Sequence, residues 1–127
     1  MRALVIDDSR VMRRIVGKNL LDLGFETIEA GNGQEALDLL ASGVEVDLAC
    51  IDWNMPVMDG LEFVTNVRAD SSLRGITLMM VTTESEQSQI VRALAAGAHE
   101  SLIKPFTPEA IREKLELLGL VPAREYV

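Results

Sequence analysis

Residues 3–8 read Ala-Leu-Val-Ile-Asp-Asp, so four consecutive apolar residues end in two carboxylates. A strand that is buried on both faces of a parallel sheet shows such an unbroken apolar run. Similar runs occur at 48–51, directly before Asp52, and at 76–81, directly before Thr82. These three runs predict the central strands of a parallel sheet, each ending next to a polar side chain.

Helical patterns lie between the predicted strands. Glycines follow three of them, at Gly24, Gly43 and Gly97, as is common after a helix. Thr107 and Pro108 are typical of an N-cap and a first-turn proline that open a fifth helix. Five apolar stripes at helical spacing are expected to face the sheet: Met12, Ile15, Val16, Leu20 and Leu23; Ala36, Leu37 and Leu40; Phe63, Val64 and Val67; Ile90, Val91, Leu94 and Ala95; and Ile111, Leu115 and Leu118.

Two further strands, at 25–30 and 98–103, contain more polar residues. Edge strands have fewer covering neighbours and tolerate such residues. We therefore predict one α/β domain, a doubly wound five-stranded parallel sheet of order 2-1-3-4-5 with five helices. The domain would span residues 1–127, with a core at about 2–118 and a tail at 119–127 that drapes over the surface.

Composition restricts the function classes. The chain has 127 residues, with 12 Lys+Arg against 20 Asp+Glu and a formal net charge of −8. This acidic balance argues against binding to nucleic acid or to an anionic membrane face. No apolar stretch reaches the length of a membrane span, and the N-terminal run is too short for a signal peptide, so we expect a cytoplasmic protein. The single cysteine, Cys50, excludes an internal disulfide and is expected to be a small buried hydrophobe.

Acidic side chains follow two neighbouring central strands. Ligands of an open parallel sheet bind at the carboxyl ends of its strands, where the strand order reverses. Asp7, Asp8 and Asp52 should therefore converge. At about 4 Å and an effective dielectric near 20, each pair of like charges costs on the order of 4 kcal/mol, which a bound cation relieves. An oxygen-only ligand set without His or Cys favours Mg²⁺.

Thr82 and Lys104 end the fourth and fifth predicted strands at the same edge. With Lys104, the three carboxylates carry a formal charge of −2, which one Mg²⁺ cancels. A metal, an ammonium and a hydroxyl around one carboxylate suit phosphoryl transfer, in which the carboxylate acts as nucleophile. Asp52 lies between an apolar run and the turn at 53–56, and we predict that it becomes an aspartyl phosphate.

Four segments together resemble the receiver domain of bacterial response regulators, in particular the single-domain chemotaxis (CheY-like) type. They are Val-Ile-Asp-Asp-Ser at 5–9, Ile-Asp-Trp-Asn-Met-Pro-Val-Met-Asp-Gly at 51–60, Met-Val-Thr at 80–82 and Lys-Pro-Phe at 104–106. The resemblance covers about residues 2–118 and implies the flavodoxin-like receiver fold. CheY is itself a known example of the order 2-1-3-4-5, so the predicted order is not independent of the resemblance.

The resemblance implies a role for each matched acidic position. Asp52 matches the phosphorylated aspartate. Asp7 and Asp8 match the acidic pair that holds Mg²⁺ together with Asp52 and the backbone carbonyl of Asn54. Asn54 also falls where the family tunes the lifetime of the phosphoryl group, and Trp53 matches a tryptophan beside the site.

The remaining matched positions concern the phosphoryl group and the switch. Thr82 matches the hydroxyl residue that engages the phosphoryl group, and Lys104 matches the lysine that pairs with it through a cis bond to Pro105. Glu84 is a second lifetime position. Ser101 departs from the family, which usually places Tyr or Phe three residues before the lysine. A serine cannot fill that volume, so of the two switch positions, Thr82 and Ser101, only the first has the usual residue type.

The implied protein is a signalling protein rather than an enzyme, although it would promote its own phosphorylation and dephosphorylation. Asp52 would take a phosphoryl group from a histidine kinase in a Mg²⁺-dependent reaction. The product would switch contacts with a downstream target through a face formed by 86–97, 98–103 and 108–118. No output domain follows the fifth helix, so we expect a chemotaxis-like signal by protein–protein contact. His99, the only histidine, is expected to be a solvated strand residue and not a phosphodonor.

Other functions use part of the same residues. A phosphorelay intermediate or a phosphate sink would have the same site and stays open. A Mg²⁺-dependent phosphatase of the haloacid dehalogenase type would have an Asp-x-Asp motif after the first strand, whereas Asp7 and Asp8 are adjacent. A flavin-binding module needs a phosphate loop at that point, where the two acids would repel phosphate. A scaffold that is never phosphorylated would need neither the acids nor Thr82 and Lys104.

Overall fold

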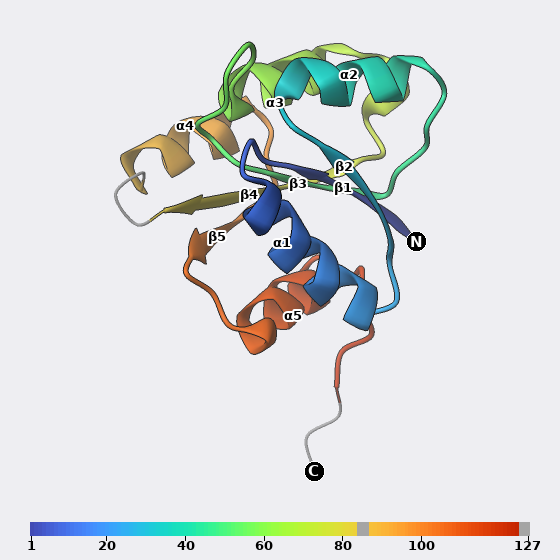
Figure 1. Ribbon diagram of the computed structural model, residues 1–127, viewed down its shortest axis with the longest axis vertical. Coiled ribbons are helices and arrows are strands. Elements are labelled where there is room, and N and C mark those ends of the chain that lie inside the picture. Colours follow the sequence, from blue (N-terminus) through green and yellow to red (C-terminus); the bar gives the residue numbers. More distant parts are fainter. Residues whose placement is uncertain (84–86, 125–127) are drawn as a thin grey trace.

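The computed structural model describes residues 1–83 and 87–124 and contains one parallel sheet of five strands (Figure 1). The strand order is β2-β1-β3-β4-β5, as predicted, with the two more polar strands at the edges. The strands are β1 (Arg2–Ile6), β2 (Glu26–Ala30), β3 (Leu48–Ile51), β4 (Thr77–Thr83) and β5 (Glu100–Lys104).

Helices cover both faces of the sheet. One face is covered by α1 (Arg10–Asp22) and α5 (Pro108–Leu117), the other by α2 (Gly33–Ala41), α3 (Gly60–Ala69) and α4 (Gln87–Ala96) (Figure 1). A short 3-10 helix, Ser71–Leu73, follows α3. Within the described part of the chain, no helix is long and apolar enough to cross a membrane.

The two cores follow from the alternation of side chains along each strand. In β1, Leu4 and Ile6 pack into the core beneath α2 and α3, while Ala3 and Val5 pack into the core beneath α1 and α5. Successive side chains of a strand point to opposite faces, so a strand that is covered on both faces must be apolar throughout. This requirement explains the unbroken apolar runs of the three central strands.

Helix caps orient the loops at the carboxyl edge of the sheet. The Ser9 side chain accepts a hydrogen bond from the Met12 amide at the start of α1, and the Asp59 side chain accepts one from the Glu62 amide at the start of α3. Thr107 caps α5 in the same way, as predicted. Such caps satisfy amides that have no partner inside the helix. They therefore set where each loop at this edge ends.

The predicted apolar stripe of α4 is largely wrong. Val91 is 70% exposed and Leu94 is 41% exposed, and Ala95 is also exposed. The helix instead buries Ala93 in the core shared with α2 and α3. Periodicity identifies apolar positions but does not say which of them face the sheet, and here α4 approaches closely through its small residues. In α1, Ile15 is likewise exposed although it belongs to the predicted stripe.

The described part of the tail packs against the domain instead of draping over it. Val121 is buried in the core beneath α1 and α5, and the Leu120 amide donates to the Leu115 carbonyl. The Arg124 guanidinium forms ion pairs with Glu109 and Glu116 of α5. The tail packs here because Val121 adds an apolar side chain to the core and Arg124 brings a cation to two glutamates of α5. Residues 125–127 lie outside the described part.

His99 is not simply a solvated strand residue. Its Nδ1 accepts a hydrogen bond of 3.0 Å from the Leu78 amide, and its own amide donates to the Leu78 carbonyl at 2.8 Å. The Arg68 guanidinium lies 3.3 Å from the same Nδ1. Partial burial and the nearby Arg68 cation both lower the pKa of His99. The neutral imidazole thus joins the beginnings of β4 and β5.

We expect the free energy of unfolding to decrease as the pH falls below about 6.5, because the unfolded histidine takes up a proton at a higher pH than the folded one. Glutamine offers an amide oxygen as acceptor without titrating. Between pH 7.5 and 5.0, the wild type should therefore lose up to about 1 kcal/mol more stability than His99→Gln, the value of one hydrogen bond. Urea unfolding at both pH values measures the difference. Equal losses in the two proteins would contradict this role of His99.

Candidate functional site

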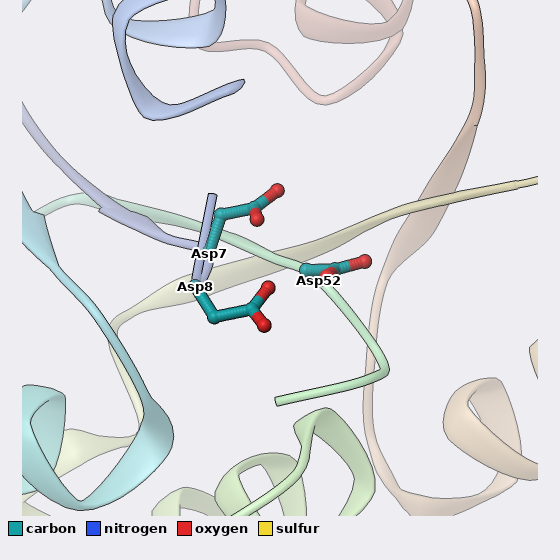
Figure 2. A group of neighbouring side chains, drawn as sticks. All are labelled: Asp7, Asp8 and Asp52. Atoms are coloured by element: carbon teal, nitrogen blue, oxygen red, sulfur yellow. The ribbon is translucent and has the colours of Figure 1, made fainter. Parts of the chain in front are cut away.

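Three carboxylates converge at the carboxyl edge of the sheet, as predicted. Asp7 follows β1 and Asp52 follows β3, and the pairing of Ile6 with Ile51 brings them side by side. One carboxylate oxygen from each of Asp7, Asp8 and Asp52 lies within 4.8 Å of the others. Figure 2 shows the three side chains pointing into the same space. The site therefore arises from the register of the two central strands.

Burial makes the charge of this cluster important. Asp7 is 4% exposed and Asp52 is 8% exposed, whereas Asp8 is exposed to solvent. Like charges in a partly desolvated site repel one another more strongly than they do in water. The cluster therefore needs positive charge nearby.

Lys104 supplies one positive charge from β5. Its Nζ lies 3.1 Å from Asp7 Oδ2 and 3.2 Å from Asp52 Oδ1. Burial opposes the charge of the ammonium, but the Asp52 and Asp7 carboxylates outweigh it and hold the pKa of Lys104 above its ordinary value. The peptide bond from Lys104 to Pro105 is cis, as the resemblance predicted.

The remaining donor set fits a hard divalent cation. Three carboxylates and one ammonium leave a formal charge of −2, and the oxygens of the cluster are close enough to share one ion. Mg²⁺ prefers oxygen ligands and is usually held by one or two carboxylates together with substrate oxygens and water. Asp7, Asp8 and Asp52 are thus suited to hold Mg²⁺.

Thr82 has an unused hydroxyl in the next strand. The residue is almost fully buried in β4, and its Oγ1 finds no hydrogen-bond partner within residues 1–83 and 87–124. A buried polar group without a partner is costly unless a ligand supplies one. Strand pairing places Thr83 beside Lys104, so Thr82 lies at the same edge as the ammonium. An anionic oxygen bound near Lys104 is the kind of acceptor that this hydroxyl lacks.

The loop after Asp52 is held by a close backbone approach. The Gly60 amide donates to the Trp53 carbonyl at 2.9 Å at the start of α3. A Cβ at Gly60 would lie 2.5 Å from the Asp52 carbonyl oxygen. Only glycine therefore fits beneath the phospho-acceptor candidate. Val57, in the same loop, adopts a φ of 69°, which is unusual for a β-branched residue.

One residue near the site was missed by the sequence analysis. Arg13 of α1 donates from Nη1 to the Asp7 carbonyl at 2.7 Å and pairs with Glu29 of β2 at 3.0 Å. It holds the loop that carries the acidic pair. Four arginine and lysine residues occur in α1, and no spacing rule distinguishes the one that turns inward.

The other predicted positions lie outside the carboxylate cluster. Asn54 is exposed in the loop after Trp53, and Ser101 is half-buried in β5, where it pairs with Met80 of β4. Glu84 lies outside the described residues. Cys50 is buried as expected, and burial raises the pKa of its thiol from 9.0 to about 12, so it offers no nucleophile at neutral pH.

Known proteins share both the sequence pattern and the fold. Residues 3–116 match the family model of the response regulator receiver domain. The chain is 43% identical to the chemotaxis protein CheY1 of Helicobacter pylori over 119 residues, which cover 93% of this chain and 96% of the relative. The structure of the chemotaxis response regulator CheY4 of Vibrio cholerae superposes with a TM-score of 0.83 at 38% identity, covering 92% and 97% of the two chains.

A further solved structure is that of the response regulator TrrA of Thermotoga maritima in complex with Mg²⁺ and BeF. It has a TM-score of 0.79 at 30% identity and covers 92% of this chain and 97% of TrrA.

We expect Gly60→Ala to destabilise the protein by about 1–3 kcal/mol, because the added methyl group must displace the backbone at Asp52 or the start of α3. Gly75→Ala is the matched control, since a Cβ there would meet nothing within 4 Å. Thermal and urea unfolding measure both variants. If the two variants were equally stable, the close approach at Gly60 would not constrain the loop.

Proposed function

We propose, since this chain belongs to the response regulator receiver family, that Asp52 is its phospho-acceptor in two-component signalling of the chemotaxis type. One observation carries the assignment: the Lys104 ammonium contacts both Asp7 and Asp52. This contact gathers the acids and a cation around one buried carboxylate, which is the environment that phosphoryl transfer requires. Residues 1–127 would act as one receiver domain in the cytoplasm, together with their kinase.

In the proposed reaction, a carboxylate oxygen of Asp52 attacks the phosphorus of a phosphohistidine on a histidine kinase. The new P–O bond forms as the P–N bond breaks, and the leaving imidazole nitrogen keeps the electron pair and takes up a proton. Lys104 offsets the negative charge that gathers on the phosphoryl oxygens. The Thr82 hydroxyl donates to one of these oxygens and so gains the partner that it lacks.

Asp7, Asp8 and Asp52 would hold Mg²⁺, with the Asn54 carbonyl as a further ligand. The formal charge of −2 and the all-oxygen donor set support this choice. When bound, the ion would neutralise charge on the transferred group. The solved complex of the similar TrrA contains Mg²⁺ and BeF, which supports the same chemistry here. Asn54 and Glu84 would tune how fast the phosphoryl group is lost by hydrolysis.

The output would pass to a downstream target protein through α4, β5 and α5. Each of these elements exposes an apolar side chain, namely Val91 and Leu94 on α4, Ile103 on β5 and Leu117 on α5. Exposed apolar residues on neighbouring elements support a protein contact surface. A phosphorelay intermediate or a phosphate sink would use the same acceptor chemistry, and the lifetime of the aspartyl phosphate distinguishes these roles.

We expect Mg²⁺ and then beryllofluoride to change the fluorescence of Trp53, the only tryptophan, because it directly follows Asp52 in the chain. Asp52→Asn should abolish the response to beryllofluoride, because the amide offers no carboxylate to coordinate it. The variant should also weaken Mg²⁺ binding at least about tenfold, a loss typical even for residues that only support a metal ligand.

Asp22→Asn is the matched control for this titration. Asp22 is exposed at the end of α1, and α1 begins at the site and runs away from it, so this variant should respond like the wild type. A beryllofluoride response in Asp52→Asn equal to that of the wild type would contradict the proposed function.

A further inference from the structure

An arginine of α4 lies over the tryptophan next to the phospho-acceptor. The Arg92 Cζ is 6.0 Å from the centroid of the Trp53 ring. Trp53 directly follows Asp52 in the chain and is 5% exposed, whereas Arg92 is exposed. A guanidinium at this distance from an indole face is attracted to it. A single side chain of α4 thus contacts the residue beside Asp52.

The carboxyl end of α4 is firmly held. Arg68 of α3 donates from Nε to the Gly97 carbonyl at 2.9 Å, directly after the helix. Gly97 packs so closely on Arg68 that a Cβ there would lie 2.4 Å from its Cγ. Ala93 is fully buried one turn earlier. Any displacement of α4 should therefore pivot about this end.

Several other side chains of α4 make few favourable contacts. The Oε1 atom of Gln89 is buried and finds no donor among residues 1–83 and 87–124. A buried acceptor without a donor costs free energy that an alternative position can recover. Val91 and Leu94 also remain exposed. These features are expected of an element that has a second position of similar free energy.

The strand β5 lacks the tyrosine or phenylalanine that the family usually places three residues before the lysine. Ser101 occupies that position in β5 and cannot fill the volume of a tyrosine. A direct route along the chain remains, since β4 continues to Thr83 and α4 begins at Gln87. A movement of Thr82 toward a phosphoryl group would therefore take place five residues before the beginning of α4. The stack of Arg92 on Trp53 links α4 directly to the residue that follows Asp52.

We propose that Arg92 is a positioning residue that couples α4 to Asp52: its stack on Trp53 holds α4 in the unphosphorylated position and is released in the phosphorylated one. This inference rests on the proposed function of Asp52. Because coupling between two sites is reciprocal, a stack that holds α4 also weakens binding of a phosphoryl mimic. The pair therefore sets how much phosphorylation is needed to move α4.

Amide hydrogen exchange over residues 87–96, with and without Mg²⁺ and beryllofluoride, tests the proposal. Arg92→Met keeps the length of the side chain and removes its charge. Without the mimic, its α4 amides should exchange about two- to fivefold faster than in the wild type, and beryllofluoride should bind about two- to fivefold more tightly, as the strength of one exposed stack implies. Arg92→Lys keeps the cation and should restore most of the wild-type behaviour.

Two controls separate the stack from general effects of charge. Arg74→Met makes the same chemical change at an exposed site after the 3-10 helix and should match the wild type. In a Trp53→Leu background, Arg92→Met should have no further effect on exchange in α4, because the aromatic face is already gone.

The outcomes distinguish this inference from the proposed function. A wild type in which beryllofluoride changes nothing would overturn both. A wild type that responds, with Arg92→Met identical to it in exchange and in beryllofluoride affinity, would overturn only the role of Arg92. An effect of Arg92→Met that persists unchanged in the Trp53→Leu background would also overturn it, because the stack could not be its cause.

Discussion

The contact of one ammonium with two buried carboxylates is the constraint on which the site depends. Lys104 Nζ reaches Asp7 and Asp52 within 3.2 Å, although the three residues lie at the ends of three different strands. Without this cation, two nearly buried carboxylates would face each other at a high electrostatic cost. The ion pairs therefore tie the end of the edge strand β5 to the centre of the sheet. They still leave enough negative charge to attract a divalent cation.

The surrounding backbone keeps these charged groups in place. Ser9 and Asp59 cap the helices that leave the edge, and Gly60 lets α3 approach the Asp52 carbonyl. Arg13 holds the Asp7 carbonyl from the side of β2. Ser9, Asp59 and Arg13 each satisfy a backbone group that lies close to buried charge. A site prepared in this way stabilises charge without reorganising during the reaction.

The covering helices differ in how tightly they pack, and this difference bears on signalling. The helix α3 buries Phe63, Val64 and Val67 in the core, whereas the one fully buried side chain among the described residues 88–96 of α4 is the methyl group of Ala93. A helix that is held by few large side chains can shift at low cost, because little apolar surface leaves the core. The same helix follows the strand that carries Thr82 and presents exposed apolar residues outward. Its loose packing therefore suits an element that reports the state of Asp52.

Much of the fold and of the site could be predicted from the sequence. Unbroken apolar runs identified the central strands, and polar residues marked the edge strands, because burial on two faces leaves no room for polar side chains. The acids at the ends of β1 and β3 could be placed together because the carboxyl ends of neighbouring parallel strands lie at the same edge of the sheet. The ends of the fourth and fifth strands likewise placed Thr82 and Lys104 at this edge. The resemblance to receiver domains supplied the cis bond, which no local pattern indicates.

Tertiary structure decided which face of each helix turns inward and which charged side chains find partners. The predicted stripe of α4 was largely wrong, and three contacts were not predicted: the inward turn of Arg13, the acceptor role of His99 and the packing of Val121. Hydrophobic periodicity follows from local geometry, so it is present in the sequence of each segment alone. The contacts of these residues join segments that are distant in the chain, and their energies depend on distances that only the packed molecule defines.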